Sequence, residues 1–389
     1  MLRLSFRLVV MEEPPIPPPL APAPPLTRPR PWVRESLLIC LGLKALLMFL
    51  GVVVAEVRLD KPFRTTAQIL GIWHQWDSRH YFDVAQNGYK APGEGTTLVL
   101  PPLLPMLIRA ASWVTGSLMS GGVLVATLIS FLPGLLMYRL ARCDLDEENA
   151  FRAMLVLLLF PTSFFIHIVY TEGLFLTTVL GAFLAARRGN WKAVAVFGVL
   201  AGLTRINAFV LAPALLFEAW GESSKGRVWR VLAALSVGVG IAVYLWINYA
   251  TAGDPLAFLT VQRVSFYRTF ASPWEGAMNV WNLASFGGSN GTMNGVLQAV
   301  CIPFFLAACV IALFRQRPSY AAWTIGQVLI FTAQGFWVSL PRLVLVLFPA
   351  FIWLAPRTAH PVFGTLWFAA STLFLSFLAG QFAQGWWVS

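Results

Sequence analysis

The chain has 389 residues, of which 58% are hydrophobic and only 12% are charged. Soluble domains carry roughly 25% charged residues, so this composition excludes an ordinary soluble protein. Apolar runs longer than about 18 residues recur, and each is long enough for a helical crossing of a bilayer. The alternating segments of roughly ten residues that a membrane barrel needs do not occur. The composition therefore predicts an all-α polytopic membrane protein.

The formal net charge of +11 would suggest a nucleic-acid partner in a soluble protein. In a membrane protein the basic residues instead collect in cytoplasmic loops and set the topology, so no nucleic-acid partner is expected. The cysteines Cys40, Cys143, Cys301 and Cys309 form no CxxC or Cys/His pattern. The sequence therefore predicts neither a disulfide nor a structural metal site.

Residues 1–35 contain the stretch PPIPPPLAPAPP, in which proline prevents helix formation. We expect a disordered, Pro-rich cytoplasmic tail here, without a cleaved signal peptide, followed by a membrane domain over 36–389. The first span covers about 36–57, and Arg28, Arg30 and Arg34 precede it. The positive-inside rule therefore places the N-terminus in the cytoplasm.

About eleven transmembrane helices are expected, with the C-terminus outside. They cover about 36–57, 117–138, 151–168, 171–186, two short spans within 191–217, 229–250, 294–314, 320–338, 341–356 and 361–383. Two larger extracytoplasmic loops, 58–96 and 251–292, lie between them.

Two of these assignments depend on the positions of arginines. Segment 97–115 is expected to be interfacial or re-entrant, because a full span there would move the following basic residues outside. Segment 191–217 is interrupted by LTRIN, and one long span would place Arg205 near the middle of the membrane. A charge at that depth costs several kcal/mol, so two short spans that meet at an extracytoplasmic turn are favoured.

The first outer loop contains HQWDSRHYFDVAQNGY, residues 74–89, with many ionisable groups. We expect a helix over 72–86 on the membrane surface, ended by Asn87-Gly88. Helical spacing places Asp77 and His80 on one face, with Trp76 beside them, and predicts an ion pair between Arg79 and Asp83. An interfacial anchor explains the tryptophans. It does not explain Asp77, which therefore indicates a functional site.

Arg205, Arg342 and Glu172 are expected at the same outer face. Converging guanidinium groups favour a phosphate, which they bind in a planar, bidentate way. The competing interpretations are interfacial snorkelling for Arg342 and a helix-start role for Glu172. The combination suggests a phosphate-bearing lipid substrate, with Asp77 as general base.

The stretch WDSRHYFDVAQNGY resembles the W-D-x-x-H-Y-x-x-[IV]-A-x-x-G-Y signature of the PIG-V-like mannosyltransferases. The resemblance continues through FPTSFFIHIVYTEGLFL, AGLTRINAFVLAPALLFEAW, GDPLAFLTVQR and PRLVLVLFP, over about residues 36–356. One departure is LPPLLP at 100–105, where relatives often have an aromatic FPxxP-like motif that bears on acceptor recognition.

This resemblance implies a GT-C-like bundle and an inverting glycosyltransferase, a hexosyltransferase that uses a polyprenyl-phosphate sugar, usually mannose, on the extracytoplasmic face. It matches Asp77 to the essential aspartate of the first outer loop, with Arg205 and Arg342 stabilising the leaving phosphate.

The expected protein is thus a glycosyltransferase of a bacterial inner membrane that acts on a lipid or glycan acceptor. Asp77 is the catalytic candidate, and the substrate-binding candidates are Trp76, Arg79, His80, Glu172, Arg205 and Arg342. No cofactor is expected, and dependence on a divalent metal is left open because one carboxylate and one histidine do not specify a site.

Two alternatives remain at this stage. A transporter or lipid flippase would show internal repeats and polar groups near mid-membrane, where Lys44 is the one exception in this chain. A catalytically inactive scaffold would not need to keep Asp77 and Arg342.

Overall fold

The computed structural model describes residues 31–59, 65–221, 226–337 and 339–388. Residues 1–30 of the expected Pro-rich tail lie outside the described residues, and the first helix begins at Pro31. All four cysteines are free thiols.

The described residues fold into α-helices joined by short turns, with no β-strand among them. The helices are α1 (Pro31–Leu59), α2 (Thr66–Gly71), α3 (Asp77–Asn87), α4 (Leu103–Thr115), α5 (Leu118–Ala141), α6 (Glu147–Leu158), α7 (Thr171–Arg187), α8 (Trp191–Thr204), α9 (Leu211–Trp220), α10 (Arg227–Leu235), α11 (Val237–Ala252), α12 (Ala257–Ser265), α13 (Pro273–Phe286), α14 (Gly288–Arg315), α15 (Pro318–Thr332), α16 (Leu340–Leu343), α17 (Phe348–Leu354) and α18 (Pro361–Ala383). Short 3-10 helices are η1 (Thr97–Val99), η2 (Ser163–Ile166), η3 (Ile206–Val210), η4 (Val344–Val346) and η5 (Ala355–Ala359).

Five helical segments of the described part are long and apolar enough to cross a membrane. They are Val33–Arg58, Leu118–Ala141, Arg227–Ala252, Gly291–Arg315 and Pro361–Ala383. A sixth crossing is obtained if Leu340–Val346 and Phe348–Ala359, which meet at a bend of 71°, count as one broken span. The remaining expected spans are shorter helices, so the described residues contain fewer full crossings than the eleven expected. The chain is an all-α polytopic membrane protein.

For both assignments that depended on arginines the structure gives the helix lengths and breaks, and the position of these segments relative to a membrane stays a prediction. Helix α4 has 13 residues, which gives it a length of about 20 Å, too short for a hydrocarbon core of about 30 Å. Helix α8 ends at Thr204, and Arg205 adopts an extended conformation with φ −152° and ψ 141° before the chain continues into η3 and α9. The expected interruption of 191–217 therefore falls at Arg205.

Small residues set the packing of α8 against the segment formed by α10 and α11. Gly198 and Gly202 on α8 face Ser236 and Gly240, and a methyl group on any of these three glycines would clash with the opposite helix. Such small-xxx-small spacing lets two backbones approach closely, which is a common way for helices to associate in a bilayer. This contact fixes the position of the end of α8, where Arg205 lies.

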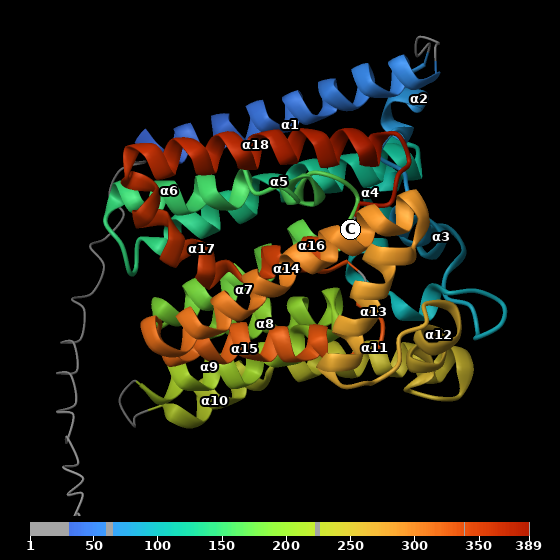
Figure 1. Cartoon of the computed structure of the whole chain (residues 1–389). Helices are drawn as coiled ribbons and strands as arrows, with labels where there is room; N and C mark the ends of the chain where they lie inside the picture. Colours follow the sequence, from blue (N-terminus) through green and yellow to red (C-terminus); the bar gives the residue numbers. More distant parts are fainter. Residues whose placement is uncertain (1–30, 60–64, 222–225, 338, 389) are drawn as a thin grey trace, which may run out of the picture.

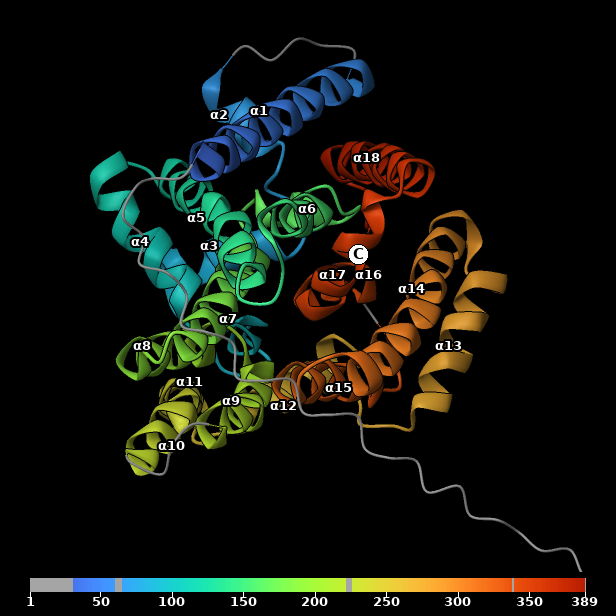
Figure 2. The same ribbon diagram turned by 90° about the vertical axis from the view of Figure 1, so that its left-hand side faces the viewer.

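Helix α7 lies at the centre of the bundle, with α5 and α6 on one side and α8 and α9 on another (Figure 2). Its residues from Thr171 to Ala186 are buried. Helix α1 lies beside both α5 and α18 (Figure 1). The helices of the two predicted outer loops, α2 and α3 from the first and α12 from the second, lie at the same end of the bundle (Figure 1). The N-terminus of α7 points to that end, so a residue there is buried and close to both loops.

Candidate active site

The first outer loop turns sharply just before Asp77. Trp76 has a φ of 52°, a left-handed conformation that no helix interior allows, and α3 begins only at Asp77. The expected helix start at residue 72 is therefore wrong. Trp73 is buried rather than interfacial, because its ring stacks on Phe382 at 6.1 Å. The expected stop is confirmed, since α3 ends at Asn87 and Gly88 has a φ of 79°.

Four charged side chains form a connected cluster at this end of the bundle, which we call the Asp77 cluster. Arg342 Nη1 lies 2.7 Å from Asp77 Oδ2, and Arg342 Nε lies 3.6 Å from Glu172 Oε1. Arg205 Nη1 donates a hydrogen bond of 2.8 Å to the same Glu172 oxygen. The structure thus brings together Asp77, Glu172, Arg205 and Arg342, all of which the sequence predicted as site residues.

Helix ends position these side chains. Glu172 lies in the first turn of α7 and Arg205 follows the last turn of α8, so each charge is on the side that the helix dipole favours. Arg342 lies in the short helix α16, and its guanidinium also covers the rings of Phe165 and Tyr170 at 5.8 and 5.5 Å. The Tyr170 hydroxyl accepts a bond of 3.2 Å from the Asp77 amide. The four charged side chains of the Asp77 cluster are therefore held by four separate elements: α3, α7, the end of α8, and α16.

The cluster is largely shielded from solvent. The side chains of Glu172 and Arg342 are 1% and 9% exposed, and that of Asp77 is 22% exposed. Burial alone would raise the pKa of the Asp77 carboxyl, but the Arg342 guanidinium, with smaller effects from Arg268 and His80, holds this pKa below its ordinary value. Asp77 is therefore ionised at neutral pH. The site thus holds an ionised carboxylate beside guanidinium groups, and such groups are suited to bind a phosphate.

Arg268 is a fifth charge near the cluster that the site prediction omitted. Burial, and then the positive charge of Arg342, lower the pKa of Arg268 to about 10, while Asp77 acts in the opposite direction. With two acids and three arginines, the group carries one excess positive charge. The sequence signal was weak, because Arg268 follows the GDPLAFLTVQR stretch that carries part of the family resemblance, without belonging to it.

Backbone strain marks the same region. Among the described residues, the non-glycine residues with positive φ are Trp76, Tyr267 and Ser339, at 52°, 54° and 71°. Trp76 and Tyr267 directly precede Asp77 and Arg268, and Ser339 lies three residues before Arg342. Each such conformation costs about 1–3 kcal/mol and persists only where the surrounding structure enforces it, which is common at functional sites.

Arg79 lies apart from the cluster. The expected Arg79–Asp83 ion pair is wrong: Arg79 donates to the His74 carbonyl and to Gln75 Oε1, and Asp83 pairs with Lys90 at 2.9 Å. The physical reason is the late start of α3, which leaves acceptors of the preceding turn within reach of Arg79.

His80 and Trp76 lie at the edge of the cluster. His80 Nδ1 is 3.3 Å from the Thr96 hydroxyl, and its charge influences Asp77. Trp76 is 40% exposed and contacts the edge of Trp387, with ring centroids 5.0 Å apart. Neither residue belongs to the ion-pair network among the described residues.

Lys44, the charged residue within the first span, faces the bundle. Its side chain is buried, and Nζ donates a hydrogen bond of 2.8 Å to the His167 carbonyl. An adjoining cavity of about 190 Å³ is lined mainly by apolar side chains, among them Met48, Phe82 and Val123. Lys44 therefore has a structural partner within the protein.

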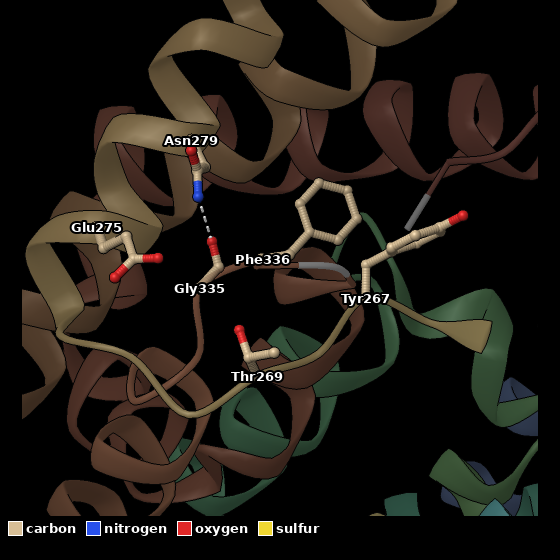
Figure 3. Close-up of a pocket in the computed structure, with 6 residues that line it drawn as sticks. All are labelled: Tyr267, Thr269, Glu275, Asn279, Gly335 and Phe336. Atoms are coloured by element: carbon tan, nitrogen blue, oxygen red, sulfur yellow. Dashed lines mark hydrogen bonds between the residues drawn. The ribbon is translucent and has the colours of Figure 1, made fainter. Parts of the chain in front are cut away.

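A second pocket, which we call the Tyr267 pocket, has a volume of about 380 Å³ and adjoins the second outer loop (Figure 3). Its lining is mixed, with two aromatic rings and several oxygen-bearing side chains. The lining residues are Tyr267, Thr269, Glu275, Asn279, Gly335 and Phe336. Within the part of the chain that the structure describes, no group of three or more His, Cys, Asp or Glu side chains is placed to hold a metal ion.

Comparisons with known proteins assign no family to this chain. No family model matches the sequence, and no curated protein matches it. Among solved structures, the chain is similar to ArnT from Cupriavidus metallidurans bound to undecaprenyl phosphate, with 15% identity, a TM-score of 0.49, and coverage of 84% of this chain and 60% of ArnT.

It is also similar to the oligosaccharyltransferase of Archaeoglobus fulgidus. The complex with Zn and sulfate shares 13% identity at a TM-score of 0.49 over 88% of this chain and 53% of the other. The complex of AglB with an inhibitory peptide and a dolichol-phosphate shares 12% identity at a TM-score of 0.46, over 92% and 56%. This chain therefore spans little more than half of the length of these structures.

Proposed function

We propose that this chain is an integral-membrane glycosyltransferase that moves a hexose, with mannose as the first choice, from a polyprenyl-phosphate donor to a lipid or glycan acceptor. The observation that carries the proposal is the Asp77 cluster, in which a shielded carboxylate lies 2.7 Å from one of several arginines. The carboxylate supplies a base, and the arginines suit a phosphate. The distribution of basic residues favours the extracytoplasmic face of a bacterial inner membrane for this site.

In the proposed reaction Asp77 is the general base. It accepts the proton of an acceptor hydroxyl while the hydroxyl oxygen attacks the anomeric carbon of the donor. The bond from that carbon to the phosphate oxygen breaks, and its electron pair leaves with the polyprenyl phosphate. Attack opposite to the leaving group inverts the configuration, so one carboxylate is enough.

Arg342 couples donor binding to the strength of this base. In the free protein its guanidinium holds the pKa of Asp77 low, which makes the carboxylate a weak proton acceptor. A donor phosphate that attracts Arg342 would weaken this ion pair and make Asp77 more basic at the moment when the donor is present. Arg342 and Arg205 would then stabilise the charge that grows on the leaving phosphate.

Glu172 acts in this proposal as a positioning residue. Its Oε1 atom accepts from Arg205 and lies close to Arg342, so one buried carboxylate holds both guanidinium groups. An arginine has five N–H donors, which leaves several for a phosphate. His80 and Trp76 border the substrate, and Arg79 fixes the turn before Asp77.

The test is transfer by purified protein in detergent, with polyprenyl phosphates that carry carbon-14-labelled mannose, glucose or galactose and a membrane extract as acceptor. Asp77→Asn should lose transfer. Asp254→Asn is the matched control, because Asp254 is exposed and caps a turn in the other outer loop, where its Oδ1 accepts from the Leu256 amide. Equal transfer by wild type and Asp77→Asn would refute the role of Asp77.

A wild-type protein that transfers none of these sugars, but moves labelled polyprenyl phosphate between the leaflets of a vesicle, would establish the flippase alternative instead.

A further inference from the structure

The Tyr267 pocket has a chemistry of its own. The Glu275 side chain lines it with no hydrogen bond or ion pair to any described residue. Asn279 uses its amide nitrogen to donate a bond of 2.6 Å to the Gly335 carbonyl, so its oxygen remains as an acceptor. Figure 3 shows these groups around one space together with the Thr269 hydroxyl. Glu275 is exposed at the rim of the pocket, so its carboxylate and the Asn279 oxygen are acceptors that a hydroxyl-bearing ligand can reach.

The rest of the lining is aromatic. Phe336 and Tyr267 both belong to the lining; in Figure 3 the Phe336 ring lies on the side of Asn279, and the Tyr267 ring, which is 74% exposed, points away from Glu275. A ligand with several hydroxyl donors and a less polar face of C–H groups satisfies both parts of the lining. A sugar ring has this combination, because its hydroxyls lie at the rim and its C–H groups can pack on an aromatic ring.

The pocket is built on two chain segments that lie side by side. The Gly335 amide donates to the Thr269 carbonyl at 3.0 Å, and the Ala271 amide donates to the Ala333 carbonyl at 3.3 Å. Helix α13 packs against these two segments, and the absence of a side chain at Gly276 lets the Trp337 ring lie directly against the helix. The pocket is therefore held by backbone hydrogen bonds and close packing rather than by a free loop.

The same segments connect the pocket to the Asp77 cluster. Tyr267 and Thr269 line the pocket, whereas the charge of Arg268 between them acts on Asp77, Arg342 and Arg205. The second segment continues from Phe336 to Arg342 within a few residues. The left-handed φ of 54° at Tyr267 lies at the junction, and such strain is typical of ligand clamps.

We propose that the Tyr267 pocket is a saccharide-binding subsite, in which Glu275 accepts hydrogen bonds from two neighbouring hydroxyls of a sugar ring that packs against the aromatic side of the lining, formed by Phe336 and Tyr267. The assignment of that ring to the donor hexose or to a sugar of the acceptor rests on the proposed function. Binding of the sugar itself does not rest on the proposed function. Sugar binding and the source of the sugar are therefore tested in separate experiments.

Binding is measured first, by saturation-transfer NMR on the purified protein with the methyl glycosides of mannose, glucose and galactose as probes. The wild type should transfer saturation to at least one glycoside. Glu275→Ala and Tyr267→Ala should weaken its binding by about 10- to 100-fold, the effect of losing a charge-assisted hydrogen bond or a buried aromatic contact. Glu94→Ala and Tyr249→Ala are matched controls, because both residues are exposed and lie outside the pocket.

Gly335→Ala provides a variant that fills the pocket without removing a polar group. Its new methyl would lie 3.2 Å from both Glu275 Oε1 and Thr269 Oγ1, and Gly335 does not need a positive φ. Gly335→Ala should also weaken binding of the glycoside, and its unfolding temperature should equal that of the wild type. If no glycoside binds the wild type, or if all three pocket variants bind as the controls do, the proposal is refuted.

Kinetics then distinguish the source of the sugar and separate the two proposals. A raised donor KM in Glu275→Ala at nearly unchanged kcat assigns the donor hexose, and a raised acceptor KM assigns the acceptor. Asp77→Asn should abolish transfer and still bind the glycoside. If the wild-type protein transfers no sugar but binds a glycoside in a way that depends on Glu275, the saccharide subsite is supported and the proposed function is refuted.

Discussion

Replacement of Arg342 by methionine is the strongest test of the Asp77 cluster. Methionine keeps most of the length of the side chain and removes the charge. Arg342 bonds Asp77 at 2.7 Å, lies 3.6 Å from Glu172 and is 9% exposed. The variant therefore leaves two shielded carboxylates with Arg205 as the remaining ion-pair partner among the described residues.

The size of the effect follows from this geometry. Removing one partner of a buried ion pair costs about 3–5 kcal/mol, and we expect the lower half of this range because Arg205 still bonds Glu172. Asp77→Asn should cost less, about 1–3 kcal/mol, since Arg342 keeps Glu172 nearby. The double variant Arg342→Met/Asp77→Asn leaves neither Arg342 nor Asp77 as an unpaired charge. Its loss of unfolding free energy should therefore be smaller than the sum of the two single losses by about 1–3 kcal/mol.

The assay is unfolding of the four proteins in detergent, followed by tryptophan fluorescence. Arg109→Met serves as the control, because Arg109 is an exposed residue of α4, and surface substitutions of this kind stay within about 0.5 kcal/mol. Losses that add up in the double variant to within about 0.5 kcal/mol would show that the two side chains do not interact, and would refute the cluster on which the proposed function depends.

Other predictions test individual parts of the structure. Because the folded-state pKa of Asp77 is lowered, its ionised form contributes stability at pH values above the ordinary aspartate pKa of about 3.9, and this contribution disappears as the pH falls through the folded-state value. The difference in unfolding free energy between wild type and Asp77→Asn should therefore be constant from pH 7 to 5 and shrink below pH 4; a constant difference at all pH values would contradict this. Ser339→Gly should raise the unfolding free energy by about 1 kcal/mol, since glycine relieves a φ of 71° and the buried hydroxyl has no partner among the described residues; an unchanged midpoint in the same unfolding assay would argue against strain there. Gly240→Ala should lose about 1–3 kcal/mol because its methyl meets the backbone of α8, whereas Gly238→Ala on the same helix has open space and should lose none; equal effects would contradict the close packing of α8 and α11.

Several features could be predicted because they depend on the chain locally or on composition. Hydrophobic runs reveal membrane helices, since the bilayer imposes one length and one polarity on each crossing. The interruption at Arg205 followed from the cost of a charge within the membrane, and the end of α3 followed from the freedom of Gly88 to adopt a φ of 79°. Lengths were less predictable, because a short apolar helix that is packed inside the protein need not span the bilayer.

Four members of the Asp77 cluster could be selected from the sequence, but their contacts could not, Arg268 was missed, and Arg79 lies apart. Asp77, Glu172, Arg205 and Arg342 could be selected because a charge is costly in an apolar chain. Which acid meets which arginine could not be predicted, because these pairs join different helices: Asp77–Arg342 joins helices far apart in the sequence, and Glu172–Arg205 joins the ends of the consecutive helices α7 and α8. Helical periodicity favoured an ion pair between Arg79 and Asp83. The turn at Trp76 instead gives Arg79 acceptors at His74 and Gln75, and Asp83 pairs with Lys90.

By itself the sequence determined the class of protein, the approximate helices and the residues whose charge needed an explanation, because those depend on the transfer of side chains from water to the membrane. Only the tertiary structure decided that Glu172 is enclosed at the end of α7, that Arg268 joins the cluster and that Tyr267 lines a pocket beside it. These features depend on distances between separate helices, and such distances are set by close packing rather than by any local pattern of residues.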